Sequence, residues 1–201
     1  EPMANGTAHA APAAEPFAII LGDACQRVPM EKVFDVAPGD LLVQRVAGSI
    51  AGRKDSTLFS SVEYAICRWK PKLMVVLVDS ESKIVRSAIE QASGGIIPSA
   101  PKRGVLDRVM VSAMRAKMQV DASAKKMTAA GRKLTIQQLT MELNAFYTIE
   151  QLLQSDVVRE AVLADGLELH AAIFEAHTGK VKMLGEHPAL AGIIGKQFAS
   201  E

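Results

Sequence analysis

Short apolar runs alternate with helix-like segments in the first half of the chain, and this alternation constrains the fold most strongly. The runs lie at Phe17–Leu21, Asp40–Val46 and Leu73–Val78, and an amphipathic helical pattern at Thr57–Arg68 separates the last two. Such runs are too short for buried helices, and Phe17–Leu21 and Leu73–Val78 have the uniform apolar character of strands covered on both faces. The sequence therefore predicts an α/β domain with a parallel β-sheet core and flanking helices.

The second half of the chain predicts long helices followed by a hairpin. Helical segments are expected at Val105–Met127 and Thr135–Gln154. An alternating segment at Leu167–Glu175 then leads through a Thr-Gly turn into Lys180–Leu184, which predicts a C-terminal edge hairpin. The first long helix carries four methionines, for which core packing is the expected role: Met110, Met114, Met118 and Met127.

We expect three regions along the 201 residues. Residues 1–16 are rich in alanine and proline, which predicts either an extended N-terminal arm that packs on a partner or a disordered segment. Residues 17–187 form the folded domain, including a helical region at 102–154, and residues 188–201 form a weakly helical tail.

Composition excludes several classes of protein. A net charge of +1 predicts no strong attraction to nucleic acid or an anionic membrane, and no apolar run is long enough to span a bilayer. Two cysteines, Cys25 and Cys67, are too few for a disulfide framework and favour a reducing compartment. Because the chain begins at Glu1 rather than Met, we expect it to be a processed chain, from which a targeting peptide was removed, or a fragment.

The first candidate site follows the first strand. Asp23, Cys25 and Arg27 alternate there, so their side chains point to one side if the extended geometry continues. Ligands of open α/β sheets bind at the carboxyl ends of the strands. A carboxylate, a thiol and a guanidinium at this place suit metal or anion chemistry.

The same stretch carries a family resemblance. The run RVPMEKVFDVAPGDLLVQRVAGSI, from Arg27 to Ile50, and the later segment SVEYAI resemble the β-class carbonic anhydrases. The C-terminal segments LLQSDVVREAV and LELHAAIFEAHTGKVKMLG are similar to that family's last helix, strand and hairpin. The resemblance implies a parallel sheet with flanking helices, usually built as a tight dimer.

The resemblance fails at the positions that hold the family's metal. The family binds zinc through two cysteines and one histidine, and these positions fall on Asp23, Asp79 and Ser82. Two carboxylates and a hydroxyl bind zinc less well than thiolate and imidazole, so we expect no zinc and no other cofactor. A shift of two residues would make Cys25 the first ligand, but 79–82 would still lack histidine and cysteine.

At three further positions near these ligands, the sequence either departs from the family's pattern or keeps it. The family's aspartate falls on Cys25, its arginine is kept as Arg27, and its glycine after the second cysteine falls on Lys83. We expect Cys25 to be a small structural residue. Salt bridges from Arg27 or Lys83 to the two aspartates would cost less free energy than leaving two unpaired carboxylates buried.

The first hypothesis is therefore a non-catalytic carbonic-anhydrase-like protein, a homodimer or a structural or regulatory subunit of a larger complex. The helical region 102–154 and the N-terminal arm are its candidate contact surfaces. The competing hypothesis is an active carbonate dehydratase with an atypical metal site or no metal. A third is a sensor that binds bicarbonate or another anion at Arg27 without turnover. The family and the start of the chain lead us to expect a chloroplast or mitochondrion, and otherwise the cytoplasm.

Overall fold

The computed structural model describes residues 15–95, 100–123 and 127–198. Most of the predicted arm, residues 1–16, lies outside these ranges, as do residues 199–201 of the predicted tail. None of the helices within the described ranges is both long and apolar enough to cross a membrane.

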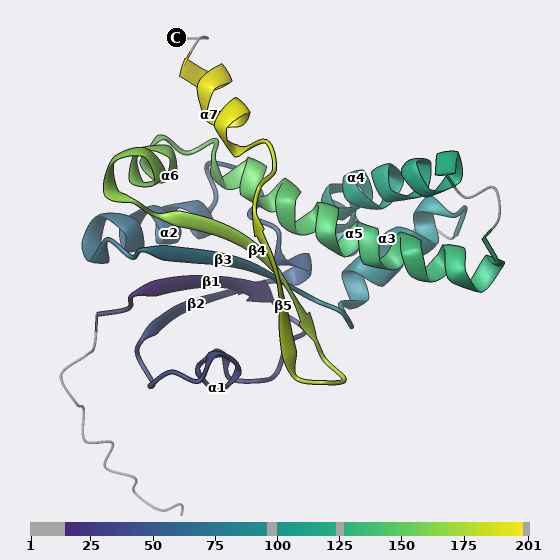
Figure 1. The fold of residues 1–201 in the computed structure, drawn as a ribbon, viewed down its shortest axis with the longest axis horizontal. Helices are drawn as coiled ribbons and strands as arrows, with labels where there is room; N and C mark the ends of the chain where they lie inside the picture. Colours follow the sequence, from purple (N-terminus) through teal and green to yellow (C-terminus); the bar gives the residue numbers. More distant parts are fainter. Residues whose placement is uncertain (1–14, 96–99, 124–126, 199–201) are drawn as a thin grey trace, which may run out of the picture.

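The described strands form one five-stranded sheet in the order β2-β1-β3-β4-β5 (Figure 1). They are β1 Ala18–Asp23, β2 Leu41–Val46, β3 Leu73–Asp79, β4 Glu168–Glu175 and β5 Lys180–Glu186. β1 pairs in parallel with β2 and β3, and β3 with β4, whereas β5 runs antiparallel to β4 at the edge. The predicted α/β fold with a parallel core and a C-terminal edge hairpin is confirmed.

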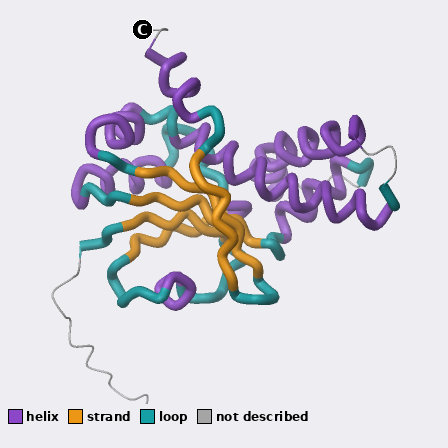
Figure 2. The backbone as a smooth tube through the Cα atoms, viewed as in Figure 1, coloured by secondary structure: helices purple, strands orange, loops and turns teal. Residues whose placement is uncertain are grey.

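Helices cover the two faces of the sheet unequally. Their bounds are α1 Met30–Phe34, α2 Thr57–Trp69, α3 Lys83–Ala92, α4 Ala100–Ser123, α5 Ala129–Leu152, α6 Asp156–Glu160 and α7 Leu190–Phe198. A 3₁₀ turn, η1 (Ala47–Ser49), follows β2, and a π-helical turn, η2 (Ala161–Asp165), follows α6. Figures 1 and 2 show α2, α5 and α6 on one side of the sheet and α1 on the other.

The central strands bury side chains on both faces, which explains their uniform apolar sequences. Ile19 and Leu21 of β1 belong to the larger core cluster beneath the helices. Ile20, between them, belongs to a smaller cluster that includes Met30 of α1. Because both faces are covered, no polar alternation is needed along β1.

The long helices α4 and α5 pack against each other and extend beyond the sheet (Figure 2). The first was predicted to reach Met127, but α4 ends at Ser123 and Met127 precedes α5. The second begins at Ala129, six residues before the predicted start. The reason is a helix cap, because the Thr128 side chain accepts a hydrogen bond from the Gly131 N–H at 3.1 Å.

The core role predicted for the methionines is wrong for three of the four. The exposed fractions are 53% for Met114, 69% for Met118 and 44% for Met127, whereas Met110 packs against the core. In α4 the buried stripe consists of Leu106, Val109, Ala113, Ala116 and Val120. Met114 and Met118 lie off this stripe, and nothing in the described residues covers that side of the helix.

Candidate functional site

Two buried carboxylates lie at the carboxyl ends of neighbouring parallel strands. Asp23 ends β1 and is 0% exposed, and Asp79 ends β3 and is 5% exposed. The parallel register of β1 and β3 places both at one edge of the sheet. They are close enough for the charge of Asp23 to raise the pKa of Asp79. The structure thus brings together two of the three positions where the resemblance expects metal ligands.

The Asp23 carboxylate is fully engaged by the backbone. One oxygen, Oδ1, accepts a hydrogen bond from the Cys25 N–H at 2.8 Å, and Oδ2 accepts one from the Gly48 N–H at 3.1 Å. The Gly48 carbonyl in turn accepts from the side-chain amide of Asn144 in α5 at 2.7 Å. Asp23 therefore joins the end of β1 to η1, and Asn144 joins η1 to α5.

Asp79 has a different electrostatic environment. Its Oδ1 accepts a hydrogen bond from the Glu81 N–H at 2.8 Å. Burial raises the pKa of the Asp79 carboxyl, the negative charges of Asp23 and Glu81 add to that rise, and the Glu81 N–H opposes it. The site therefore holds one carboxylate fixed by two N–H groups and one whose charged form is disfavoured.

Ser82, at the third implied ligand position, is the cap of a helix. The residue is 2% exposed, and its hydroxyl oxygen accepts from the Val85 N–H at 3.4 Å as the N-cap of α3. Its backbone N–H donates to the Asp79 carbonyl at 3.0 Å. Serine suits this position because its oxygen satisfies a helix N–H that has no partner within the helix.

The extended geometry that would have aligned Asp23, Cys25 and Arg27 does not continue past Asp23, contrary to the sequence prediction. The chain turns immediately after β1, since the Gln26 N–H donates to the Asp23 carbonyl at 3.1 Å. Cys25 becomes half-buried and Arg27 exposed. The cause is the aspartate itself, whose carboxylate captures the N–H two residues ahead and so forms a turn.

The expected salt bridges are also absent between the described residues. No ion pair within 4.0 Å joins Asp23 or Asp79 to Arg27 or Lys83 there. Lys83 is an exposed residue at the start of α3. The backbone N–H groups near each carboxylate satisfy it instead, so a lysine or arginine is not required.

Three residues of this region were not singled out as site residues in the sequence. Arg45 donates to the backbone carbonyls of Gln26 and Val28, each at 2.6 Å, and so holds the loop after β1. Gln26 is 2% exposed, and neither its amide nitrogen nor its amide oxygen has a partner in the described residues. Asn144 lies 96 residues from the carbonyl that it binds, so no local pattern could identify it.

The side chains at this edge do not fit the zinc that the resemblance implies. Both oxygens of Asp23 and the hydroxyl of Ser82 already accept backbone hydrogen bonds. Within the described part of the chain, no group of three histidine, cysteine, aspartate or glutamate side chains could hold a metal ion. Zinc sites need three firm protein ligands, usually thiolate or imidazole, so this donor set is unsuitable.

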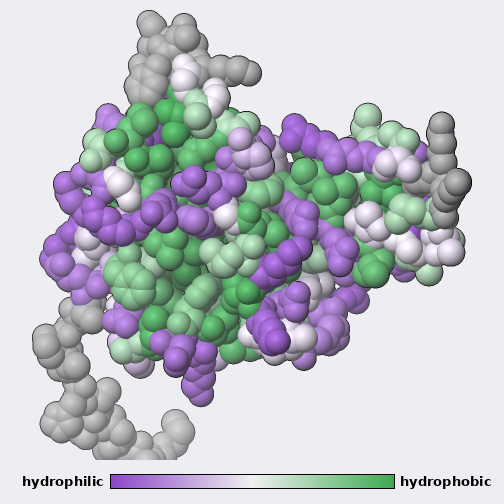
Figure 3. Space-filling model, in the orientation of Figure 1, coloured by the Kyte–Doolittle hydropathy of each residue, from purple (hydrophilic) through white to green (hydrophobic). Residues whose placement is uncertain are grey.

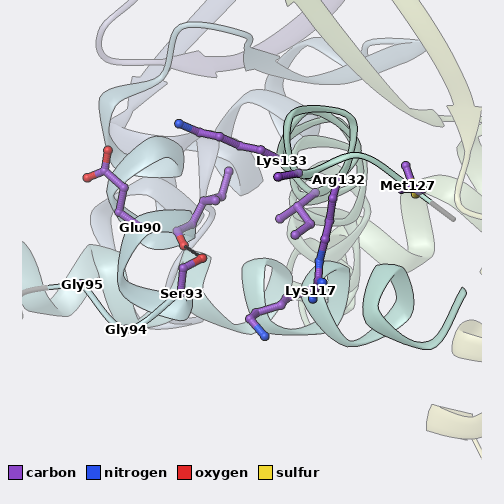
Figure 4. Close-up of a pocket in the computed structure, with 11 residues that line it drawn as sticks. Glu90, Ser93, Gly94, Gly95, Lys117, Met127, Arg132 and Lys133 are labelled. Carbon is purple, nitrogen blue, oxygen red and sulfur yellow. Dashed lines mark hydrogen bonds between the residues drawn. The ribbon is translucent and has the colours of Figure 1, made fainter. Parts of the chain in front are cut away.

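A large pocket lies away from the two aspartates. It encloses about 920 Å³ between α3, α4 and α5 (Figure 4). Figure 4 shows Arg132 beside Lys117 in one wall, and Lys133 pointing toward the side on which Glu90 lies. Lys117 and Arg132 both pair with Asp121, so their charge is partly neutralised within the protein.

The matching family model and the curated relatives are all carbonic anhydrases. The family model described as carbonic anhydrase matches residues 18–181. Carbonic anhydrase 2 of Mycobacterium tuberculosis H37Rv is 35% identical over 100 residues, which cover 50% of this chain and 47% of that protein. The carbonic anhydrase of Mycolicibacterium smegmatis is 29% identical over 133 residues, covering 66% and 63%. The matches thus span about half to under two thirds of these curated relatives.

Solved structures agree with the fold. A tetrameric β-carbonic anhydrase of Sordaria macrospora aligns with a TM-score of 0.70 and 24% identity, covering 85% of this chain and 81% of that one. A β-carbonic anhydrase of Aspergillus fumigatus aligns with a TM-score of 0.72 and 21% identity, covering 92% and 83%. At these identities the similarity establishes the architecture alone.

Proposed function

The chain belongs to the carbonic anhydrase family, and we propose that it is a non-catalytic member of that family. It would serve as a structural or regulatory subunit of a larger assembly. The observation that carries this proposal is the state of Asp23. Its carboxylate occupies the first ligand position, yet both oxygens accept backbone N–H groups. A residue committed in this way stabilises the strand end rather than presenting a free ligand.

The donor chemistry at the other two positions supports the same proposal. Burial raises the pKa of Asp79 and so disfavours its charged carboxylate form. The hydroxyl oxygen of Ser82 is occupied as the N-cap of α3. A catalytic zinc would need three firm ligands and one open position for water. Exchanging all three ligand types removes the affinity for zinc while leaving the strand ends and helix start in place.

Exposed apolar side chains support a role in an assembly. Large ones on the surface of the described residues are Phe17, Val28, Tyr64, Met114, Met118, Met127, Leu134, Leu163 and Met183. Figure 3 shows apolar surface gathered over the sheet region between hydrophilic borders. The Sordaria macrospora relatives are described as tetrameric. We propose a homodimer or a larger complex, which light scattering coupled to size-exclusion chromatography would measure.

The second candidate is an active carbonate dehydratase with an atypical metal site or no metal. Asp79 favours it, because a buried carboxyl with a raised pKa at a strand end has the properties of a general acid or base. Binding of bicarbonate at Arg27 without turnover is the third. Arg27 is exposed and makes no ion pair with another described residue.

One experiment separates these candidates. Metal content is measured by elemental analysis on the purified protein, and CO₂ hydration is followed by stopped flow on the same sample. The non-catalytic proposal expects substoichiometric metal and no rate above the uncatalysed reaction. Turnover with or without bound metal would establish the dehydratase. Saturable bicarbonate binding without turnover, lost in Arg27→Gln, would establish the sensor.

A further inference from the structure

A second pocket, distinct from the strand-end aspartates, is rich in hydrogen-bond donors. It encloses about 530 Å³ between the loop that follows η1 and the helices α4 and α5. Arg53, Lys54 and the acidic Asp55 line it from the loop, Arg108 from α4, and Tyr147 and Gln151 from α5. Its volume is within the range of small-molecule sites in proteins. None of these residues belongs to the Asp23–Gly48–Asn144 network.

The cations of this pocket are not fully neutralised. Arg53 makes two hydrogen bonds to Asp55, at 2.9 and 2.8 Å, and Lys54 lies 3.4 Å from Asp156. Arg108, in contrast, is half-buried and has no carboxylate within 4.0 Å among the described residues. A guanidinium has five N–H donors, and this one has no hydrogen-bond partner in the described part of the chain, so it is available to bind an anion in two-point geometry.

Two side chains that line the pocket with Arg108, Gln151 and Tyr147, are held in place by contacts within the protein. The buried Gln151 accepts a hydrogen bond from the Gly52 N–H at 3.3 Å, which ties the loop to α5. The guanidinium of Arg115 lies 5.9 Å from the centroid of the Tyr147 ring, which fixes the ring and adds positive charge nearby. A site whose side chains are held before binding loses less conformational entropy when a ligand arrives.

We propose that this pocket binds a small molecule that carries a phosphate group, with Arg108 as the principal phosphate ligand. Arg108 supplies the positive charge for the phosphate, because it has no carboxylate within 4.0 Å among the described residues, whereas Arg53 and Lys54 are already paired with Asp55 and Asp156. The pocket is larger than an inorganic anion requires, and Tyr147 and Gln151 offer neutral polar groups for an attached hydroxyl-bearing body. This binding is independent of whether the chain hydrates CO₂.

Isothermal titration calorimetry on the full chain at low ionic strength tests the proposal. The probes are ribose 5-phosphate, inorganic phosphate and unphosphorylated ribose, each at up to about 10 mM. We expect saturable binding of one ribose 5-phosphate per chain and no binding of ribose. Inorganic phosphate competing at equal affinity would assign recognition to the phosphate alone, and weaker competition would assign part of it to the sugar; both outcomes support the site.

Variants locate the binding. Arg108→Gln should weaken it about tenfold or more, as expected for loss of a charge-assisted hydrogen bond. Arg108→Lys keeps the charge but not the two-point geometry and should weaken it less. Arg103→Gln, an exposed arginine of the same helix, is the matched control and should bind as the unaltered chain does. The proposal is overturned if neither phosphate compound binds, or if Arg108→Gln binds unchanged or Arg103→Gln is weakened equally.

Discussion

The carboxylate of Asp23 accepts a hydrogen bond from the backbone N–H of Gly48, 25 residues further along the chain, at 3.1 Å. This contact joins the end of β1, where the family resemblance predicts a metal ligand, to the turn that follows β2. A buried carboxylate here performs a structural task that depends on neither metal nor turnover. Its consequences for stability and metal binding can be measured.

Removing the Asp23 carboxylate should destabilise the domain. Asp23→Ala leaves the N–H groups of Cys25 and Gly48 without their acceptor. We expect the free energy of unfolding to fall by about 2–4 kcal/mol, because each orphaned buried N–H costs about 1–3 kcal/mol. Urea denaturation measures the change. Asp107→Ala, at an exposed aspartate, is the control, and equal stability of the two variants would contradict the structural role.

Gly48 should not tolerate a side chain. Its φ is +72°, and a Cβ would lie 3.0 Å from Cγ2 of Val109 and 3.3 Å from Cγ2 of Ile84. We expect Gly48→Ala to cost about 2–4 kcal/mol, combining the left-handed backbone with overpacking. Gly166→Ala is a matched control, since its φ is also +72° with no atom within 4 Å. Thermal melts should show the larger loss at Gly48, and equal losses would exclude the steric part.

The stability contributed by Asp79 should fall as pH rises. Its folded-state pKa is raised above the ordinary 3.8, so above that pH the unfolded chain releases the proton first. Stability is therefore lost as pH rises from 3.8 through the folded pKa, and it is constant below and above that window.

Asp79→Asn isolates this effect, because its amide oxygen can still accept the Glu81 N–H while the charge is gone. Urea denaturation between pH 4 and 8 should show the variant gaining stability relative to the unaltered chain as pH rises. Asp107→Asn should show no such trend. A difference that stays constant across the range would show that ionisation of Asp79 is not responsible.

Restoring the family's ligands should restore metal binding. The variant Asp23→Cys, Asp79→His, Ser82→Cys places two thiols and an imidazole at the strand ends. We expect one zinc per chain by elemental analysis, against a substoichiometric amount in the unaltered protein.

Without metal this triple variant should be less stable than the unaltered chain, since it loses the Asp23 acceptor and the Ser82 cap. Added zinc should recover that loss, because a ligand bound only to the folded state stabilises it. Stoichiometric zinc in the unaltered protein would instead show that its own side chains form a metal site.

Much of the fold was predictable because its signals are local. The runs at Phe17–Leu21 and Leu73–Val78 have the length and uniform apolar character of strands buried on both faces, and both became central strands. The family resemblance predicted that Asp23, Asp79 and Ser82 stand at the ligand positions, and this assignment stays a prediction. These features depend on residue type and on spacing along the chain.

The sequence by itself determined the strand and helix alternation and the resemblance to the carbonic anhydrase family, whereas the replacement of the usual zinc ligands by Asp23, Asp79 and Ser82 stays a prediction. Only the tertiary structure decided the surroundings of Asp23: the turn immediately after β1, the Asp23–Gly48 contact and the distant amide of Asn144. The reason is physical. A buried carboxylate must find donors, but whether these are backbone N–H groups or lysine and arginine side chains depends on which segments the fold brings within hydrogen-bond distance.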